Sequence, residues 1–223
     1  MDMRTSWAVP HRQGYNYTPA KVGEVPLFIS GVPIVEKEIP ETSFSCKVLT
    51  GDEELDSAYR HRHDVFIVEK GIAEATNYPN GREHDEYDPF SLHVALLQGD
   101  DIVAYTRLVL PCDEFPLERT NDIPSHYFNR RYSVEVSRAL IVKEYRRCAN
   151  NAIWHLFNSV YEICQERGVE TMLSFSNTIM YNGYKKRGVP FAYVGEPVLF
   201  HGHQSHPLVI SVDRNRPPNF LLH

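Results

Sequence analysis

The pattern of hydrophobic and polar positions divides the chain into an irregular first part and a regular remainder. Residues 1–43 show neither helical nor strand periodicity and carry several prolines, so we expect an irregular arm there. Its apolar stretches, Val25–Ile29 and Val32–Val35, are the parts expected to lie on the main domain. From residue 44 to residue 223 the pattern is regular and predicts a single domain.

Alternating or continuous apolar stretches predict the strands of a central sheet. The predicted strands are Phe44–Leu49, Leu92–Gln98, Ile102–Leu110, Tyr132–Val142, Val169–Phe175, Phe191–Phe200 and Leu208–Val212. Gly99-Asp-Asp101 is short and polar, which favours a tight turn between the second and third of these strands.

Apolar residues at steps of three and four predict three helices between the strands. The first places Leu55, Ala58, Tyr59, Arg62 and Phe66 on one face. The second covers Arg146–Arg167 and the third Asn177–Arg187, each followed by a glycine. This mixed order of strands and helices predicts an α/β (α+β) fold with helices packed on a central sheet.

Composition narrows the class of protein. The chain has 223 residues, a formal net charge of −6 and 23% charged residues. The negative charge argues against nucleic acid as a partner, because binding to phosphates needs a basic surface. No apolar run reaches the roughly 20 residues of a membrane-spanning helix. The first stretch has no apolar h-region and is interrupted by prolines, so we do not expect a signal peptide there. The four cysteines form no C-x-x-C pair, so we expect reduced thiols in the cytoplasm.

Several charged residues stand at positions where burial is expected. Arg62 lies on the apolar stripe of the first helix, Arg107 lies in a predicted strand, and Glu135 and Arg138 lie in a strand rich in valine. A buried lone charge costs several kcal/mol, so these residues should either pair with one another or face a wet cleft. The pattern alone favours neither alternative.

The spacing of Glu135 and Arg138 requires an irregularity in the strand if both side chains are to face one cleft. Residues three apart on a regular strand point to opposite faces. A β-bulge between them would bring both side chains into one cleft, and bulges are common beside active sites.

The charged residues recur in an order that resembles a known family. Arg62-x-x-x-Phe66, Asp85-Glu-Tyr-Asp88, Arg107-Leu108 and Glu135-Val-Ser-Arg138 are similar to motifs of the acyl-homoserine-lactone (autoinducer) synthases and their relatives, the N-acyl amino acid synthases. The stretch from Tyr78 to His93, with Arg138 leading to Tyr145-Arg-Arg147, is most similar to the branch of exosortase-associated acyltransferases. The resemblance covers about Leu55 to Arg147.

The resemblance implies a GNAT-like acyltransferase domain over residues 44–223, with its central sheet splayed between two parallel strands. Tyr132–Val142 and Val169–Phe175 are the predicted pair. The family transfers a fatty acyl group from acyl carrier protein, or sometimes from coenzyme A, to an amine. An acyl carrier protein and an amine acceptor (an amino acid or a peptide side chain) are therefore the implied partners. The acyl thioester is a substrate, and no permanently bound cofactor or metal is implied.

The residues suit that reaction. An amine at neutral pH must lose a proton before it attacks a thioester, and Glu135 is the candidate base. Arg138 would orient Glu135 or stabilise charge. By analogy with the family, Arg62, Asp85, Asp88 and Arg107 form the network that shapes the acceptor site, and Phe66 lines the pocket near the thioester. Backbone N–H groups of the splayed strand are expected to stabilise the oxyanion.

Two departures from the family pattern refine the expectation. The lactone-forming branch usually has a tryptophan where Ile72 stands, which weakens lactone synthesis as the function. The glycine-rich turn of enzymes that bind coenzyme A is replaced by Arg146-Arg-Cys-Ala-Asn-Asn151. Arg146 and Arg147 at a helix N-terminus could hold one phosphate, which favours the phosphopantetheine of a carrier protein over coenzyme A.

Other polar features have simpler interpretations. Cys148 and Cys164 could offer a covalent route, but both fit a buried helix face. His201, His203 and His206 are expected in a turn between strands and not at a metal site. Lys185-Lys-Arg187 complements a helix dipole and could help to dock a carrier protein. A basic dock beside the donor entrance is predicted from a larger set, Arg130, Arg131, Lys143, Arg146 and Arg147.

Aromatic residues are abundant, with 13 Tyr and 11 Phe. Most should be ordinary core, but some are expected to line a tunnel for the acyl chain. The candidates are Phe66, Tyr105, Phe157, Tyr161, Phe175, Tyr181, Tyr184, Phe191 and Tyr193.

Three functions remain open at this point. The first is N-acylation of an amino acid or peptide side chain. The second is a lactone-type signal synthase with S-adenosylmethionine as the acceptor. The third is a non-catalytic GNAT-like module that binds acyl groups or peptides.

Overall fold

The computed structural model describes residues 37–38, 44–146, 151–200, 203–217 and 220–222. The predicted arm at 1–43, with its segments Val25–Ile29 and Val32–Val35, therefore lies outside the described residues except for β1, Lys37–Glu38. β1 pairs antiparallel with β2, so this part of the arm contacts the sheet.

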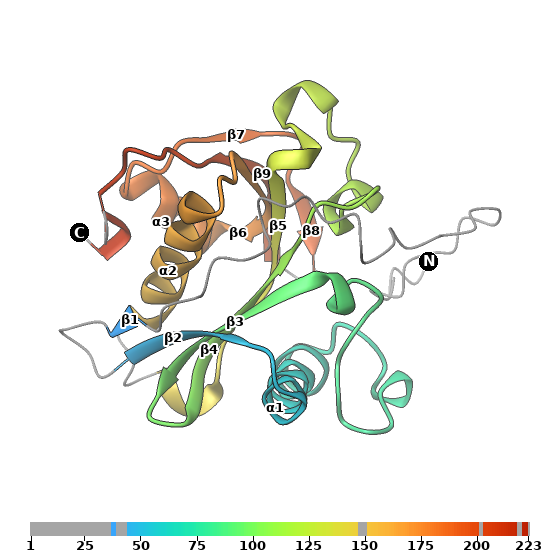
Figure 1. The fold of residues 1–223 in the computed structure, drawn as a ribbon. Coiled ribbons are helices and arrows are strands. Elements are labelled where there is room, and N and C mark those ends of the chain that lie inside the picture. Colours follow the sequence, from blue (N-terminus) through green and yellow to red (C-terminus); the bar gives the residue numbers. More distant parts are fainter. Residues whose placement is uncertain (1–36, 39–43, 147–150, 201–202, 218–219, 223) are drawn as a thin grey trace, which may run out of the picture.

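The described strands form one mixed sheet of nine strands (Figure 1). After β1, the strands are β2 Phe44–Leu49, β3 Ser91–Gln98, β4 Asp101–Val109, β5 Ser133–Ile141, β6 Thr171–Asn177, β7 Phe191–Tyr193, β8 Val198–Phe200 and β9 His203–Ser211. Their order is β1-β2-β3-β4-β5-β6-β9-β7, and β8 also pairs with β9. All neighbours are antiparallel except β5 and β6, which are parallel.

The sequence located the first four predicted strands to within a residue or two. It was wrong about the last two, because the predicted strand Phe191–Phe200 is two short strands, β7 and β8. The predicted turn that contains His203 and His206 is instead the first half of β9. Both short strands pair with β9, whose polar first half does not show the apolar pattern of a buried strand.

Three helices accompany the sheet, and two of them differ from the prediction. α1 is Asp52–Arg62, and a π-helical segment, His63–Glu69, continues it without a break. α2 is Ala152–Glu166, which begins six residues later than predicted, because Asn151 has a left-handed backbone (φ 68°) and precedes the first helical residue. α3 is Thr178–Lys186, with the Asn177 side chain accepting from the N–H of Met180. None of the described helices is long and apolar enough to cross a membrane.

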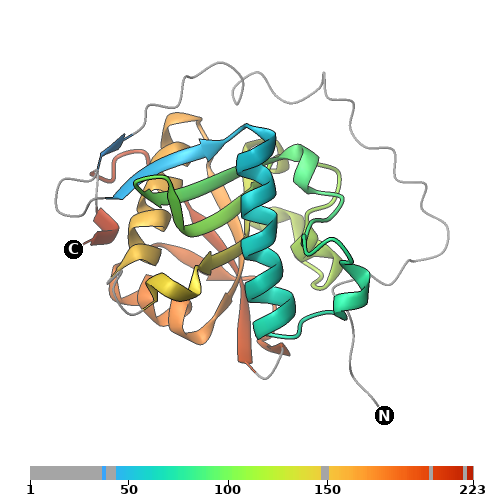
Figure 2. The ribbon, with the colours of Figure 1, turned by 90° about the horizontal axis from the view of Figure 1, so that it is seen from below.

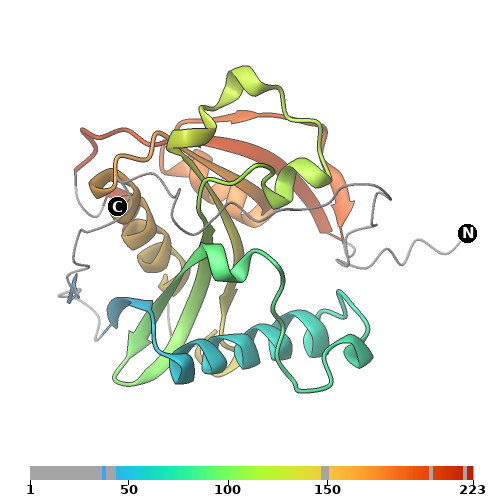
Figure 3. The same ribbon diagram turned by 45° about the vertical axis from the view of Figure 1, so that its right-hand side comes forward.

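The two faces of the sheet carry different covers. α2 and α3 pack on one face, where side chains such as Val136, Met172 and Leu208 join the largest apolar cluster. On the other face lie α1, the loop 71–90 and the segment 111–130, which we call the cover segment. Figures 2 and 3 show α1 on that side, crossing β3 and β4, with the yellow-green cover segment at the other end of the face.

Strands β5 and β6 separate part of the way along. Their parallel pairing starts at Ser133↔Thr171 and ends at Val136↔Ser174, although β5 continues to Ile141 and β6 to Asn177. This confirms the splayed pair of parallel strands. The separation begins next to Glu135, so the candidate base stands at the point where the sheet opens.

Candidate functional site

A network of charges, all buried except the partly exposed Asp85, occupies the sheet face between α1 and the cover segment. We call it the ion network, and its members are Arg62, Glu83, Asp85, Asp88, Arg107 and Arg138. Of the two alternatives left open by the pattern of charges, the residues do pair with one another. Three arginines face three carboxylates, so the network is formally neutral.

Arg62 extends from the end of α1 and is fully buried. Its Nε donates to Glu83 Oε2 at 2.6 Å, and its Nη1 and Nη2 donate to the two oxygens of Asp88 at 2.5 and 3.2 Å. The side-chain aromatic rings of Tyr59 and Tyr105 also lie near the guanidinium. All three side-chain nitrogens of Arg62 therefore donate to carboxylates, and the guanidinium does not reach solvent.

Glu83 and Asp85 link the loop to β5. Arg138 donates from Nε and Nη2 to Glu83 Oε1 at 3.1 and 3.0 Å, and from Nη2 to Asp85 Oδ2 at 3.0 Å. Burial alone would raise the pKa of Glu83, but Arg138 and Arg62 override it and lower this pKa to about 2. The pKa of Asp85 is likewise held well below its usual range by Arg107 and Arg138 against the effect of burial. Both carboxylates are ionised at neutral pH.

The β-bulge demanded by the sequence is present in β5. Between the pairs Tyr105↔Leu140 and Arg107↔Ser137, β4 advances two residues and β5 advances three. Arg138 is at this extra position and has a left-handed backbone with φ 57°. Such a backbone is uncommon for a residue with a side chain, and G1-type bulges use it. The bulge brings Arg138 to the face that carries Glu135.

Glu135 lies beside the ion network but is not paired within it. It is 3% exposed, and its Oε2 accepts the backbone N–H of Leu117 at 2.7 Å. Burial raises the pKa of Glu135 to about 8, and the Leu117 N–H, Arg107 and Arg138 limit the rise. A pKa near the working pH is what a general base or acid needs.

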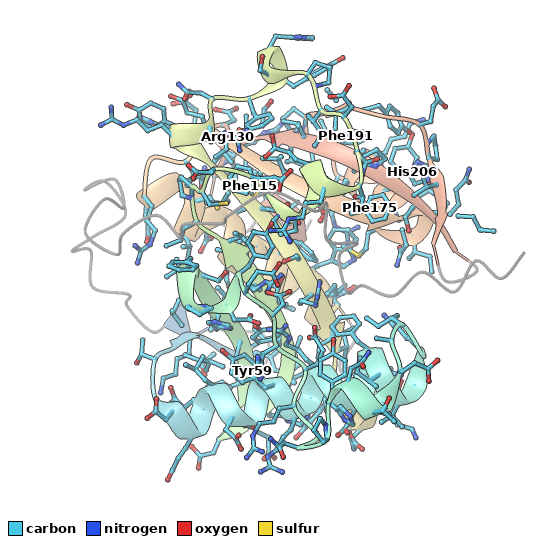
Figure 4. The ribbon with its side chains drawn as sticks, turned by 90° about the vertical axis from the view of Figure 1, so that its right-hand side faces the viewer. Tyr59, Phe115, Arg130, Phe175, Phe191 and His206 are labelled. Atoms are coloured by element: carbon cyan, nitrogen blue, oxygen red, sulfur yellow. The ribbon has the colours of Figure 1, made fainter. Side chains whose placement is uncertain are left out.

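Ion pairs hold the cover segment in place over the Glu135 carboxyl group. Arg119 donates to Glu86 at 2.5 Å and to Glu114 at 3.2 Å, and its guanidinium lies 4.7 Å from the centre of the Tyr87 ring. Arg130 makes a bidentate pair with Glu118 at 2.6 Å for both bonds. In Figure 4, Phe115 and Arg130 of the cover segment lie at one end of the site and Tyr59 of α1 at the other.

Phe66 belongs to the π-helical segment. It is buried in an apolar cluster with Leu140 of β5 and with Val142, which follows β5, and the ammonium of Lys70 lies 4.9 Å from the centre of its ring. π-helical turns often mark functional sites. Ile72, which stands where the lactone-forming branch usually has tryptophan, is buried in the same cluster.

The predicted phosphate site is only partly described. Arg146 is not at the start of α2, since it lies in a turn after β5, where it donates to the Ile141 carbonyl at 3.1 Å and to Glu69 at 2.7 Å. It therefore stands near the open end of β5, already paired. Arg147 lies outside the described residues.

The predicted basic dock does not form one patch. Arg130 and Arg131 precede β5, whereas Lys143 and Arg146 follow it. Nine residues of strand place the two groups about 30 Å apart. These cations are near one another in the sequence, but the length of β5 separates them in the structure. The prediction of one basic dock was therefore wrong, and the cations form two distant sets. Arg147 lies outside the described residues.

The structure also places some of the cysteines considered for a covalent route and of the histidines considered for a metal site. Cys164 is buried in α2, and burial raises its pKa to about 12, so it is a thiol without nucleophilic character at neutral pH. Cys148 and His201 lie outside the described residues. His206 is buried in β9 and stacks on Tyr181, with ring centres 4.8 Å apart. Within the described residues, no group of three or more potential metal ligands is found.

The aromatic candidates are distributed over both faces. Phe157, Tyr161 and Tyr184 line an apolar cavity between α2, α3 and the splayed strands, together with Val136 and Met172. Its volume is about 10 Å³, close to the size of one water. Tyr181, Phe191 and Tyr193 contact one another beside β9. Phe66 and Tyr105 lie in the cluster under α1, and Phe175 packs with the cluster under the cover segment.

Sequence reasoning missed several members of the site. Glu83 bridges Arg62 and Arg138, yet no role was predicted for it. A count of charges could have found it, because three buried arginines against only two aspartates require a third acid. Ser137, which accepts from Arg107 at 3.1 Å, and Leu117, whose N–H reaches Glu135, carry no such signal.

Comparison with known proteins places this site in a family context. Residues 61–155 match the family model described as an acetyltransferase (GNAT) domain. This range runs from the last residues of α1 to the first turn of α2 and includes the whole ion network and Glu135. Among curated proteins, none matches the sequence.

Several solved structures have similar folds. BjaI, a CoA-dependent acyl-homoserine lactone synthase determined with SAM and isopentyl-CoA, is 25% identical over 72% of this chain and 76% of its own, with a TM-score of 0.57. The acyl-homoserine lactone synthase LasI is 12% identical over 76% of this chain and 90% of its own, with a TM-score of 0.62. A putative N-acetyltransferase from Lactobacillus plantarum is 16% identical over 77% of this chain and 100% of its own, with a TM-score of 0.55.

These findings confirm the predicted fold class, a mixed α/β sheet of GNAT type with flanking helices. They do not test the finer resemblance to the exosortase-associated branch, which stays a prediction. Residues 61–155 match a GNAT acetyltransferase domain, and the fold is similar to that of the acyl-homoserine lactone synthases.

Proposed function

We propose that this protein is an N-acyltransferase that transfers a fatty acyl group from a thioester of acyl carrier protein, or of coenzyme A, to the amine of an amino acid or peptide side chain. The observation that carries the proposal is Glu135. It is a buried carboxyl group with a pKa of about 8, located where β5 and β6 part and beside a neutral network of paired charges.

Glu135 accepts the proton that the amine has to lose. The amine nitrogen then forms a bond to the thioester carbon, the carbon–sulfur bond breaks, a second proton of the nitrogen passes to the departing sulfur, and the proton held by Glu135 is released to solvent. In the free protein Glu135 is mostly protonated at pH 7, because its pKa is about 8. A substrate ammonium within about 4–6 Å favours the ionised carboxylate, so binding of the acceptor lowers the pKa of Glu135 and converts it to the form that can accept a proton.

The arginines have supporting roles in this proposal. Arg138 holds its left-handed position through Glu83 and Asp85, and its charge, with that of Arg107, limits the pKa of Glu135. Arg62, Asp85, Asp88 and Arg107 shape the acceptor site. Backbone N–H groups at the opening between β5 and β6 stabilise the tetrahedral oxyanion.

The donor would enter from the end at which the strands diverge. Phe66 lines the pocket near the thioester, and Arg146 lies at the same end of β5, with Arg147 next in the sequence. The acyl chain would lie among the aromatic residues that line the small cavity, which requires those side chains to move apart. Carrier protein remains the favoured donor because the glycine-rich turn is missing, although BjaI is described as CoA-dependent.

Mass spectrometry of the products tests the proposal. The protein would be incubated with hexanoyl, decanoyl and palmitoyl thioesters of both carriers and with a panel of amines: amino acids, lysine-containing peptides and S-adenosylmethionine. We expect an N-acyl product and free thiol. The value of kcat/KM for the acceptor should rise with pH and level off above about 8, where Glu135 is ionised.

Glu135→Gln is the discriminating variant. We expect kcat to fall by about 10²- to 10⁴-fold, whereas Glu114→Gln, an exposed carboxylate of the cover segment, should leave it unchanged. Equal activity of wild type and Glu135→Gln would refute the role of Glu135. An intact thioester with every amine would refute the function, and binding of acyl carrier protein without turnover would favour the non-catalytic module.

A lactone-type synthase is the second candidate, because acyl-homoserine lactone synthases are among the similar structures and BjaI was determined with SAM. Ile72 opposes it in the sequence. Product formation that depends on S-adenosylmethionine would decide in its favour.

A further inference from the structure

The apolar cavity between α2, α3 and the splayed strands is far smaller than a fatty acyl chain. Its volume is about 10 Å³, close to the size of one water. One part of its wall is Leu221, which belongs to the short 3-10 helix Phe220–Leu222. We call this element the closing turn, and Figure 1 shows it in red beside α2. An acyl chain can occupy this place only when part of the wall leaves it.

The cavity lies next to the point where the sheet opens. Val136 lines the cavity, and with Ser174 it forms the last parallel pair of β5 and β6. Successive side chains of a strand point to opposite faces, so Glu135 lies on the ionic face and Val136 on the apolar face under α2. A thioester held near Glu135, between the separating strands, would therefore direct its acyl chain into the cavity.

Most of the cavity wall belongs to regular structure. Val136, Met172 and Ile210 lie in β5, β6 and β9, and each of them pairs with residues of neighbouring strands. Phe157 and Tyr161 lie within α2. Large movements of these residues would break strand pairing or a helix, and a close-packed core leaves little room for small ones. This part of the wall is fixed.

The closing turn is held by side chains and not by the sheet. The N–H of Leu221 donates to Asn158 Oδ1 at 3.4 Å, and its carbonyl accepts from Arg187 Nε at 2.6 Å. The Phe220 ring packs edge-on against Tyr161, with ring centres 4.8 Å apart. The Leu221 side chain is nevertheless buried, with only 2% of the residue exposed. Leu221 is therefore the part of the wall that can leave without disrupting a strand or a long helix.

The exchange of Leu221 for an acyl chain has a small net cost. Burial of apolar surface stabilises in proportion to the area buried, whichever molecule provides it. A leucine side chain corresponds to about four methylene groups, so a chain that takes its place recovers the burial that Leu221 loses. The N–H and the carbonyl of Leu221 bind water once they leave the core, which offsets most of the loss of their two hydrogen bonds.

We propose that Leu221 fills the far end of the acyl-chain site in the free protein, and that a long acyl chain displaces it together with the closing turn. Leu221 is thereby a specificity-determining residue for the acyl donor. A short chain ends before Leu221 and leaves the turn in place, whereas a long chain takes the position of its side chain. This inference rests on the proposed function, because that function supplies the acyl chain.

Substitutions of Leu221 test the inference through the preference for chain length. With one amine, kcat/KM would be measured for the hexanoyl, decanoyl and palmitoyl thioesters. One buried methylene corresponds to about fourfold in affinity. Leu221→Ala vacates the space of about three methylenes, so the ratio of palmitoyl to hexanoyl should rise at least about 10-fold. Leu221→Phe should lower the ratio by a similar factor.

Leu222→Ala is the matched control for these variants. Leu222 belongs to the same turn and is partly buried against the same apolar cluster, but it does not line the cavity. Its substitution should leave the ratio unchanged. An unchanged ratio in both Leu221 variants, or an equal change in Leu222→Ala, overturns the inference and leaves the proposed function standing.

Hydrogen exchange on the wild-type protein tests the displacement without turnover. In the absence of an amine, the palmitoyl thioester should speed exchange of the Leu221 amide, because the chain separates it from Asn158. The hexanoyl thioester should leave this exchange unchanged. Bound palmitoyl donor with unchanged exchange at Leu221 overturns the inference. Faster exchange without acylation of any amine overturns the proposed function and supports the acyl-chain site, and absence of binding by every thioester overturns both.

Discussion

The two faces of the sheet are built from different interactions. The face under α2 and α3 is apolar, with Leu156 and Val160 fully buried against the strands. The opposite face carries five buried charges and the partly buried Asp85 between α1 and the cover segment. An apolar face gains stability from any well-packed side chain, whereas a buried ion network is stable only when every partner is present. The first face gives the domain its stability, and the second gives one region a defined chemistry.

Removal of one network member should have the largest effect on stability. Arg62→Ala leaves Glu83 and Asp88 buried without their partner, so we expect a loss of about 3–5 kcal/mol in the free energy of unfolding. Urea denaturation followed by circular dichroism measures it. The control is Arg60→Ala in the same helix, whose exposed pair with Asp56 should be worth at most about 0.5 kcal/mol. Similar losses in both variants would contradict the contrast between the faces.

On the apolar face the sensitive position is Gly183 of α3. A Cβ there would lie 2.1 Å from Cζ2 of Trp154, far inside contact distance. Gly183→Ala should therefore lower the free energy of unfolding by about 1–3 kcal/mol, although alanine is the better helix former. Asn182→Ala, on the exposed side of the same turn, is expected to change it by less than about 0.5 kcal/mol. Thermal unfolding compares the two, and a stabilised Gly183→Ala would show that α3 is not packed closely on α2.

The carboxyl groups of the ionic face should respond to pH in opposite directions. The lowered pKa of Glu83, about 2, adds stability that is complete above about 4.5 and lost as the pH falls toward 2. The raised pKa of Glu135, about 8, adds stability that is complete below about 4.5 and lost as the pH rises toward 8, by about 1.4 kcal/mol per pH unit. Glu135→Gln should remove this second loss, whereas Glu114→Gln should keep it. Denaturation between pH 5 and 8 measures the slopes, and identical slopes for wild type and Glu135→Gln would contradict the buried, unpaired state of Glu135.

The cover segment should give the smallest effect on global stability. Arg119→Ala removes contacts with Glu86, Glu114 and the Tyr87 ring, for which we expect about 1 kcal/mol or less. Because Arg119 holds the segment that places Leu117 on Glu135, the amide of Leu117 should exchange its hydrogen faster. Hydrogen-exchange mass spectrometry tests this against Arg131→Ala. Unchanged exchange would mean that other contacts hold the segment.

How far the sequence determines the structure also differs between the faces. The apolar face follows from periodicity, which placed α3 and most of the strands to within one or two residues. α2 was the exception, because the apolar pattern does not reveal the left-handed backbone of Asn151, the residue directly before the helix. β9 was missed in its first half because His203 to His206 are polar and pair between two other strands.

On the ionic face the sequence indicated which charges are unusual but not all of their partners. The bulge at Arg138 could be predicted because two charges three residues apart had to share a face. The contact from Leu117 to Glu135 joins residues 18 apart through a backbone N–H, and a backbone group leaves no trace in the amino-acid pattern. The prediction of one basic dock failed for a different reason. Its cations are near one another in the sequence, but the length of β5 separates them in the structure.

The single extra residue in β5 also limits which insertions and deletions this strand can tolerate. Insertion or deletion of one codon near Arg138 would change the register between β4 and β5, and every side chain beyond that point would turn to the other face of the sheet. The guanidinium of Arg138 would then enter the apolar layer under α2, while a side chain of that layer would face Glu83. Substitutions in β5 can accumulate one at a time, whereas any change in its length shifts the whole register. Related proteins that retain the chemistry should therefore keep the same number of residues between Glu135 and Leu140.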